Sequence, residues 1–159
     1  MMVKRYALSF LLGLFSIALA AQNQEEEAVK HTITAFFKAF HEKDSLALYD
    51  VVHKTIQVQT VKNDSNGHSV LKTEAYSSLV NAIITIPDSI HFEERILDYS
   101  IQIDGAMANA WTTYEFWLNN EFHHCGVNSF QLFKENKEWK IIYLIDTRRV
   151  GDCKPPTLK

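Results

Sequence analysis

The sequence contains few of the residues that interrupt or crosslink a chain: 2 cysteines, 3 prolines and 5 glycines among 159 residues. Two cysteines, Cys125 and Cys153, do not define a disulfide scaffold, although they can pair in an oxidising compartment. Internal repeats, low-complexity stretches and an internal linker are also missing. These absences favour a single globular domain with a hydrophobic core.

Long hydrophobic runs are absent too, apart from one near the N-terminus. Residues 7–20 carry no charge, Lys4 and Arg5 precede them, and Ala18-Leu19-Ala20 fits the small-x-small rule for cleavage. This pattern is typical of a secretory signal peptide, whereas a membrane anchor needs roughly 20 apolar residues. We therefore predict a signal peptide over residues 1–20, export to the periplasm or the cell exterior, and no membrane span in the mature chain.

The rest of the chain is predicted to form one domain over residues 21–150 and a short tail over 151–159, which contains Pro155-Pro156. The sequence lacks a surplus of positive charge, with 16 Lys and Arg residues against 19 Asp and Glu residues. Loss of Lys4 and Arg5 with the signal peptide makes the mature chain more acidic. Nucleic-acid binding needs a basic surface, so no nucleic-acid partner is expected.

Apolar residues at helical spacing mark the start of the domain. Between Glu25 and Lys43 they recur every three or four positions, at Val29, Ile33, Phe36, Phe37 and Phe40. This spacing predicts an amphipathic helix with a bulky inward face. Asp44 is suited to cap a second, shorter helix, and Thr73 to cap a third helix that ends before Pro87.

Strand patterns fill most of the remaining sequence. Residues 56–62 alternate between apolar and polar side chains, and longer strand-like runs cover about 90–103, 106–118, 122–134 and 139–148. The turns between the long runs are Asp104-Gly105, Asn119-Asn120 and the polar residues 134–138, of which Asp-Gly is the strongest hairpin signal. The order α-α-β-β-α-β-β-β-β predicts an α+β fold with helices packed on one face of an antiparallel sheet.

Three segments carry a resemblance to a known family: AFHEKDSLAL, IDGAMANAWTTYEFWL and HCGVNSFQLFKENKEWKIIYLIDTRR. In the last segment, Gly126, Phe130 and Leu132 precede Trp139-Lys140-Ile141. This ending resembles that of the nuclear-transport-factor-2-like superfamily, also called SnoaL-like. Lys43-Asp44 departs from the family, whose members commonly have Gly-Asp before the second helix.

The resemblance implies a cone-like domain, in which a strongly curved sheet wraps a long helix around an internal pocket. It also implies dimers that form through the outer face of the sheet. It implies no single function, because the superfamily includes isomerases, dehydratases, polyketide cyclases and plain binding modules.

Strand alternation suggests which side chains line such a pocket. A two-residue turn at Asn119-Asn120 places Glu115 opposite His124, and a similar turn at Asn136-Lys137 places His124 beside Arg149. The face that these residues share is the more apolar one, and we expect it to line the pocket. Its polar and aromatic members include Trp111, Glu115, His124, Asn128, Tyr143 and Arg149.

The hairpin at Asp104-Gly105 conflicts with this assignment. Carried through that turn, the same register puts Asp98 and Ser100 inside the cone and Tyr99 and Ile101 outside it. A β-bulge in the run 106–118 would reconcile the two hairpins, since bulges are expected where sheets curve strongly.

The candidate catalytic residues are Glu115 and His124, because a carboxylate beside an imidazole can orient it or raise its pKa for proton transfer. The candidate ligand-binding residues are Trp111, Asn128, Tyr143 and Arg149, with Arg149 holding an anionic group. The alternative is a cross-strand polar pair without a ligand.

The run FHHCGVNSF, residues 122–130, suggests a metal site or a cysteine nucleophile at first sight. Alternation separates His123 and Cys125 from His124, whereas zinc needs three or four converging ligands. A cysteine nucleophile needs a base or positive field beside it, and a disulfide between Cys125 and Cys153 would compete. We therefore expect no metal and no cofactor.

The run 106–118 has aromatic residues on both faces, including Trp111, Tyr114, Phe116 and Trp117. A strand of this kind needs a cover on each side, so we predict a homodimer through the outer face of the sheet. Three functions stay open: an exported domain that binds a small, partly apolar molecule, which we favour, an acid–base enzyme of the isomerase or dehydratase kind, and a protein-interaction module in the cell envelope.

Overall fold

The structure is a computed structural model that describes residues 3–153, and the side chains of residues 22–153. Its helices are α1 (Val3–Glu42), α2 (Ser45–Asp50) and α3 (Tyr76–Ile84). Its strands are β1 (Val52–Asn63), β2 (Ser69–Glu74), β3 (Phe92–Asp104), β4 (Met107–Leu118), β5 (Glu121–Glu135) and β6 (Glu138–Arg148). The predicted element order and the α+β class are confirmed.

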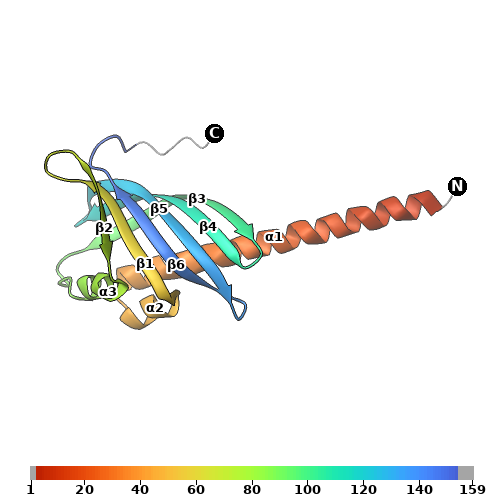
Figure 1. The fold of residues 1–159 in the computed structure, drawn as a ribbon, viewed down its shortest axis with the longest axis horizontal. Helices are drawn as coiled ribbons and strands as arrows, with labels where there is room; N and C mark the ends of the chain where they lie inside the picture. Colours follow the sequence, from red (N-terminus) through yellow and green to blue (C-terminus); the bar gives the residue numbers. More distant parts are fainter. Residues whose placement is uncertain (1–2, 154–159) are drawn as a thin grey trace.

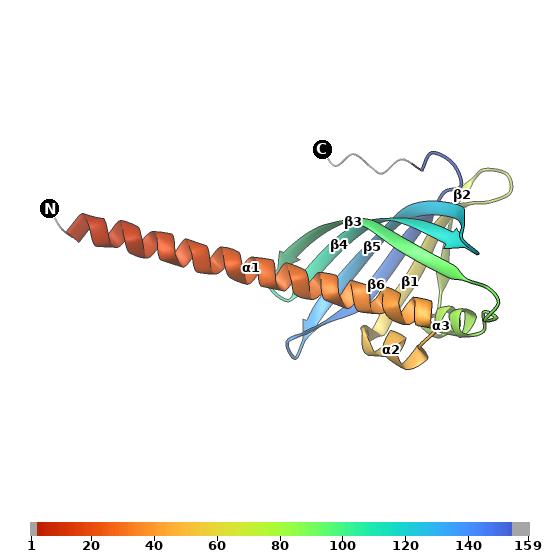
Figure 2. The same ribbon diagram turned by 180° about the vertical axis from the view of Figure 1, so that it is seen from behind.

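The strands form one strongly curved sheet in the order β2-β1-β6-β5-β4-β3 (Figure 1). The run from β3 to β6 is the expected antiparallel meander, and β1 joins it by parallel pairing with β6. Helix α1 crosses the concave face, with α2 and α3 near its C-terminal end (Figure 2). The sheet and these helices enclose the core.

Helix α1 buries the face that its spacing predicts. Val29 and Ile33 are fully buried, and Phe36 and Phe37 are nearly so. The rings of Phe36 and Phe37 each lie with their centroids 6.0 Å from that of Phe130 on β5. This aromatic contact fixes the helix against the middle of the sheet.

The N-terminal half of α1 extends beyond the sheet (Figure 2). None of the described helices has an apolar stretch long enough to cross a membrane. The signal peptide over 1–20 and the domain boundaries at 21–150 stay predictions. Residues 1–2, and residues 154–159 of the expected tail, lie outside the described residues.

Asp44 caps α2 as predicted, because its Oδ1 accepts a hydrogen bond of 3.0 Å from the backbone N–H of Ala47. Lys43, where the family commonly has glycine, adopts a positive φ of 55°. Its Nζ donates to the backbone oxygen of Ile86 at 2.8 Å and pairs with Asp88 at 3.0 Å. The lysine thus ties the end of α1 to the loop after α3.

We expect Asp44→Ala to lower the free energy of unfolding by about 1 kcal/mol, because the first turn of α2 loses its side-chain acceptor. Urea denaturation measures this loss. Asp50→Ala is the matched control, since it removes a carboxylate from the negative end of the same helix dipole and should not destabilise. Equal losses in the two variants would contradict the capping role.

The third helix begins later than predicted. Thr73 lies in β2, and the N-cap of α3 is Ala75, which makes no side-chain capping bond. Pairing of β2 with β1 extends to Glu74 opposite Val58. Thr73 therefore forms part of this strand pairing instead of capping α3. Local capping preference is the weaker of the two effects here.

The hairpin turns form where they were predicted. Asn119 and Asn120 have φ values of 51° and 65°, and Asn136 and Lys137 have values of 50° and 73°. Two consecutive positive φ values define the turn type that matches the twist of a β-hairpin. Next to both turns, the strand pairing also follows the expected register.

Farther along the strands, three extra residues change the register. Trp117 pairs with Phe122 but Phe116 pairs with His124, so His123 is extra in β5. In the same way, Ile142 is extra in β6 and Leu97 is extra in β3. The predicted bulge in 106–118 is therefore wrong, since the extra residues lie in the neighbouring strands.

These bulges remove the conflict between the two hairpins. Ala108, Ala110 and Tyr114 of β4 are buried on the concave side, and Tyr99 and Ile101 of β3 pack against the core with them. The sheet curves strongly around α1 (Figure 1), and bulges are expected in a sheet of this kind. A one-residue shift exchanges the two faces of a strand, so every cross-strand pair predicted for the pocket changes.

Candidate functional site

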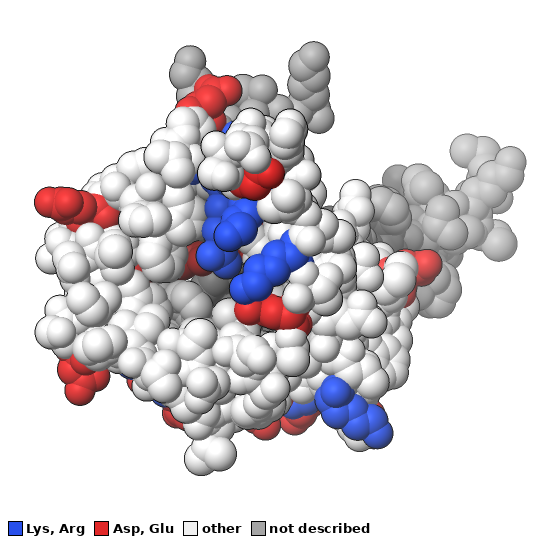
Figure 3. Space-filling view, turned by 60° about the vertical axis from the view of Figure 1, so that its left-hand side comes forward, with Lys and Arg blue, Asp and Glu red and all other residues white. Residues whose placement is uncertain are grey.

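A cavity of about 280 Å³ lies between the concave face of the sheet, α1 and α3. One side is apolar and is formed by Phe36, Phe37, Phe40, Val58, Leu79, Phe116 and Leu144. Figure 3 shows the surface hollowed at the end that carries α3, β1 and β2 in Figure 1, with basic and acidic atoms beside the hollow. A small concave site with an apolar wall and a few polar groups is typical of ligand pockets.

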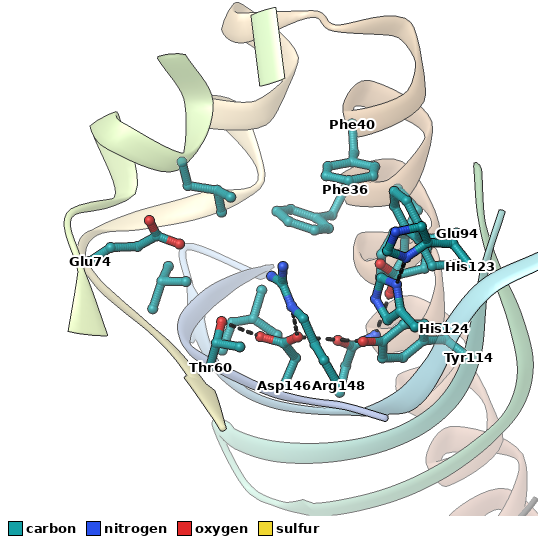
Figure 4. Close-up of a pocket in the computed structure, with 16 residues that line it drawn as sticks. Phe36, Phe40, Thr60, Glu74, Glu94, Tyr114, His123, His124, Asp146 and Arg148 are labelled. Carbon is teal, nitrogen blue, oxygen red and sulfur yellow. Dashed lines mark hydrogen bonds and ion pairs between the residues drawn. The ribbon is translucent and has the colours of Figure 1, made fainter. Parts of the chain in front are cut away.

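Asp146 of β6 organises the polar wall of the cavity. Its Oδ1 accepts a hydrogen bond of 2.6 Å from the Thr60 hydroxyl, and its Oδ2 accepts one of 2.8 Å from Nε of Arg148. The Tyr114 hydroxyl lies 3.4 Å from the same Oδ2 and donates more closely, at 2.8 Å, to the backbone oxygen of Thr147. Alternation along β6 places Asp146 and Arg148 on the same face, beside each other (Figure 4).

Tyr114 reaches these partners because its cross-strand neighbour is Gly126. A Cβ at Gly126 would lie 2.7 Å from the tyrosine ring and 1.8 Å from the backbone oxygen of Thr147. The tyrosine ring therefore occupies the space that a side chain would fill. Gly126, which carried part of the family resemblance, is needed here for close packing.

Glu94 of β3 forms the other polar contact of the cavity. Its Oε1 accepts a hydrogen bond of 2.7 Å from Nδ2 of Asn128, and its backbone N–H donates to Nε2 of His41 at 2.9 Å. Burial raises the pKa of Glu94 to about 8, with a further upward contribution from Asp146 and opposing ones from Asn128 and Arg148. At neutral pH its second oxygen therefore carries a proton.

The stability of the protein should depend on pH through Glu94. The folded chain holds this proton up to about pH 8, whereas an unfolded glutamate releases it near pH 4.5. Between these values the folded state binds more protons than the unfolded state, so the free energy of unfolding falls as pH rises. We expect a loss of about 1 kcal/mol from pH 6.5 to pH 8, because cavity water screens part of the full effect. Below pH 6.5 the low pKa of His124 contributes in the opposite direction.

Glu94→Gln should make the free energy of unfolding less dependent on pH, since an amide oxygen still accepts from Asn128 but does not titrate. Urea titrations between pH 6.5 and pH 8 give the slope of the free energy of unfolding against pH. Glu93→Gln is the control, because this neighbour pairs with Arg95 at 2.7 Å and its pKa is lowered by that contact. A Glu94→Gln protein with the wild-type slope would contradict the assignment.

His123 and His124 lie side by side on the cavity wall, with their Nδ1 atoms 2.8 Å apart. Burial, together with the positive charge of Arg148, lowers the pKa of His124 to about 4. The His124 ring is therefore neutral at physiological pH and stacks on Phe116, with 4.8 Å between ring centroids. It can exchange a hydrogen bond with His123 but carries no charge.

The structure places two of the sequence-predicted site residues, His124 and Asn128, on the cavity wall. The other four do not line it. Glu115 pairs with Cys125 instead of His124 and accepts a hydrogen bond from Trp117. Trp111 is 43% exposed, Tyr143 donates to Gln59, and Arg149 donates to the backbone oxygen of Asp152.

The physical reason for these differences is the extra residue in each of two strands. His123 shifts β4 against β5, and Ile142 shifts β5 against β6, so the expected pairing of Glu115 with His124 does not form. The groups that replace the expected ones are Thr60, Glu94, Tyr114, Asp146 and Arg148. The alternation of Leu144, Asp146 and Arg148 gave one sequence signal, while nothing local distinguished Glu94 from the adjacent Glu93.

Cys125 and Cys153 form a disulfide with a Cα–Cα distance of 5.7 Å, which answers the pairing question that the sequence left open. Cys125 is also bridged to Arg149 by two backbone hydrogen bonds, of 3.0 Å and 2.9 Å. The segment after β6 is thereby held on β5. Within the described part of the chain, no three His, Cys, Asp or Glu side chains converge as metal ligands.

No protein-family model and no curated protein matches the sequence. Solved structures, in contrast, match the fold. A protein of unknown function from Shewanella baltica, described as NTF2-like, aligns with a TM-score of 0.58 at 15% identity, over 80% of this chain and 96% of its own. The chain has the nuclear-transport-factor-2-like fold. The predicted resemblance is confirmed at this level.

Two further solved structures share this NTF2-like fold. One, from Novosphingobium aromaticivorans and described as having a cystatin-like fold, aligns with a TM-score of 0.65 at 13% identity, over 87% of this chain and 92% of its own. The other, from Streptomyces avermitilis, is provisionally assigned as a dehydratase and aligns with a TM-score of 0.63 at 13% identity, over 82% and 99%. At these identities the likeness concerns the fold alone.

Proposed function

We propose that the protein binds a small, partly apolar molecule in the cavity between α1 and the sheet. The observation that carries this proposal is the division of the cavity into two walls. Phenylalanines of α1 face a polar wall built around Asp146 and Arg148 (Figure 4). A cavity of about 280 Å³ suits a compact ligand, since an engineered cavity of about 150 Å³ already admits benzene.

Native mass spectrometry of the purified protein tests this proposal by detecting a retained molecule. Leu79→Trp should abolish retention, because Leu79 lines the cavity and the larger ring would fill it. Leu71→Trp is the matched control, since Leu71 is 59% exposed on β2 and should leave retention unchanged. The proposal would be contradicted if wild type and Leu79→Trp retained the same molecules and bound added probes with the same affinity.

Export through a signal peptide over residues 1–20 is part of the same proposal. The disulfide supports it, because disulfides persist in oxidising compartments such as the periplasm. In α1, the described side chains first become buried at Val29, so cleavage after Ala20 would leave the buried face intact. Intact-mass measurement of the exported protein should give a chain that starts at Ala21, whereas an uncleaved chain would contradict this prediction.

A second candidate function is acid–base catalysis of the isomerase or dehydratase kind. Glu94 and Asp146 support it in place of Glu115 and His124, because a protonated carboxyl and an ion-paired carboxylate share one cavity. Dehydration of a β-hydroxy carbonyl compound, followed by absorbance of the product, is the assay. Glu94→Gln should lower the rate by about 100-fold or more, while Glu115→Gln should not. Unchanged activity in Glu94→Gln would exclude this mechanism.

A homodimer through the convex face of the sheet is the partner that we propose. Met107, Trp111, Phe122 and Phe133 are each at least 40% exposed and belong to β4 and β5. Apolar surface of this kind is typical of interfaces. Light scattering after size-exclusion chromatography should give a dimer for wild type and a monomer for Trp111→Glu. A wild-type monomer would instead favour the protein-interaction module.

A further inference from the structure

We propose that the ligand of the cavity is a small apolar carboxylate, whose carboxyl group is held by the guanidinium of Arg148. The inference rests on the proposed binding function and specifies its ligand class. It depends on three observations: the free donor atoms of Arg148, the partners that already occupy both oxygens of Asp146, and the apolar wall opposite.

The guanidinium of Arg148 has hydrogen-bond donors that no other group uses among the described residues. Its Nε is used by Asp146, but neither Nη atom has a hydrogen-bond partner among the described residues. The side chain is 48% exposed, and Figure 4 shows its terminal nitrogens directed into the cavity towards Phe36. Two parallel N–H groups on a rigid plane match the two oxygens of a carboxylate.

The neighbouring carboxyl groups do not compete for these donors. Both oxygens of Asp146 already accept hydrogen bonds, from Thr60 on one side and from Arg148 on the other. Glu74 at the far wall pairs with Lys72 at 3.0 Å. Glu94 is protonated at neutral pH and accepts from Asn128, so it offers a donor on its second oxygen. Asp146 and Glu94 therefore leave both Nη atoms of Arg148 available to a ligand.

The apolar wall indicates the size and the apolar character of the rest of the ligand. Phe36 and Phe40 of α1 lie across the cavity from Arg148 (Figure 4). Phe37 of α1 and Leu79 of α3 also line the cavity. With about 280 Å³ available, and about 30 Å³ for each water-sized group, the ligand has about ten non-hydrogen atoms. Phenylacetate has this size and places an aromatic ring against the phenylalanines while its carboxylate reaches Arg148.

Isothermal titration calorimetry with three matched probes tests the inference: phenylacetate, its neutral amide and phenethylamine. At pH 7 we expect phenylacetate to bind at least about tenfold more tightly than the amide, and the amine to bind least, because only the carboxylate completes the charge-assisted pair. Equal affinities for the acid and the amide, or a higher affinity for the amine, would contradict the proposal that the ligand is a carboxylate. The proposal that the cavity binds a small molecule would still stand.

Variants of two adjacent arginines test whether Arg148 causes the preference for the acid over the amide. Arg148→Gln should remove the preference for the acid over the amide, and Arg148→Lys should retain part of it, since lysine keeps the charge next to Asp146 but loses the planar fork. Arg149→Gln is the control, because Arg149 donates to Asp152 outside the cavity. A preference that survives Arg148→Gln and Arg148→Lys unchanged in folded protein would overturn the role of Arg148.

The dependence of phenylacetate binding on pH tests the inference independently. The groups around Glu94 are Asp146 and Arg148 on β6, Tyr114 on β4, His124 and Asn128 on β5, and His41 on α1. Ionisation of Glu94 adds a negative charge beside the carboxylate, so phenylacetate binding should weaken by about tenfold from pH 7 to pH 9. In Glu94→Gln this weakening should disappear, and its persistence there would count against the inference.

The same titrations separate this inference from the proposed function. If none of the three probes binds at millimolar concentration and the purified protein retains no molecule, both fail together. If the amide or the amine binds at least as tightly as phenylacetate and Leu79→Trp prevents that binding, the binding function stands and only the carboxylate assignment fails.

Discussion

Gly126→Ala is expected to lower the melting temperature by about 10 °C or more. The new methyl carbon would lie 1.8 Å from the backbone oxygen of Thr147 and 2.7 Å from the ring of Tyr114. Neither neighbour can move cheaply, because the first is main chain of β6 and the second is a buried ring that hydrogen-bonds to that same oxygen. Overpacking and loss of this bond together cost about 3 kcal/mol, at about 4 °C per kcal/mol.

Differential scanning calorimetry measures the shift, and Gly151→Ala is its matched control. A methyl group at Gly151 would have no heavy atom within 4 Å, so the same substitution there should change the melting temperature very little. Because Tyr114 also contacts Asp146, Gly126→Ala should weaken phenylacetate binding as well. A melting temperature of Gly126→Ala equal to that of Gly151→Ala would contradict this prediction. It would mean that β6 and Tyr114 can move to accommodate the methyl group.

Reduction of the disulfide is expected to have the second large effect. The bond between Cys125 and Cys153 closes a loop with a sequence separation of 28 residues. Opening a loop of this length returns conformational entropy to the unfolded chain, worth about 3.5 kcal/mol. The melting temperature should therefore fall by about 10 °C in a reducing buffer, and Cys153→Ser should melt at the same lowered temperature in either buffer.

Hydrogen exchange distinguishes this entropic effect from a change in the folded state. Without the disulfide, the two backbone bonds between Cys125 and Arg149 alone hold the segment that follows β6. Amide exchange at residues 149–153 should therefore accelerate, and binding of phenylacetate should weaken if Arg148 loses its position. A reduced protein with the oxidised melting temperature would show that the disulfide contributes nothing to stability.

The consequence for function is that the cavity is built from residues of several distant segments. Arg148 and Asp146 come from the last strand, Glu94 from the third, and the phenylalanines from the first helix. The disulfide and Gly126 both act on the same region, where β5 meets the end of β6. Stability and ligand binding should therefore respond together to changes in this region.

Local sequence patterns predicted the order of the elements and several of their ends, although not the start of α3. The spacing of Val29, Ile33 and the phenylalanines placed the buried face of α1, Asp44 predicted the cap of α2, and Asn119-Asn120 predicted a hairpin turn. Each of these depends on residues within a few positions of one another, and their physical causes are local: helical periodicity, a capping bond and backbone sterics. The NTF2-like fold followed from their order.

Which side chains face the cavity depends on contacts between distant parts of the chain. His123, Ile142 and Leu97 each look like ordinary strand residues, yet each is an extra residue that reverses the alternation beyond it. Bulges accompany strong curvature of a sheet, and this curvature depends on packing between segments far apart in the chain. For this reason the arginine that lines the pocket is Arg148 rather than Arg149, and the acidic residues that line it include Glu94 and Asp146 but not Glu115.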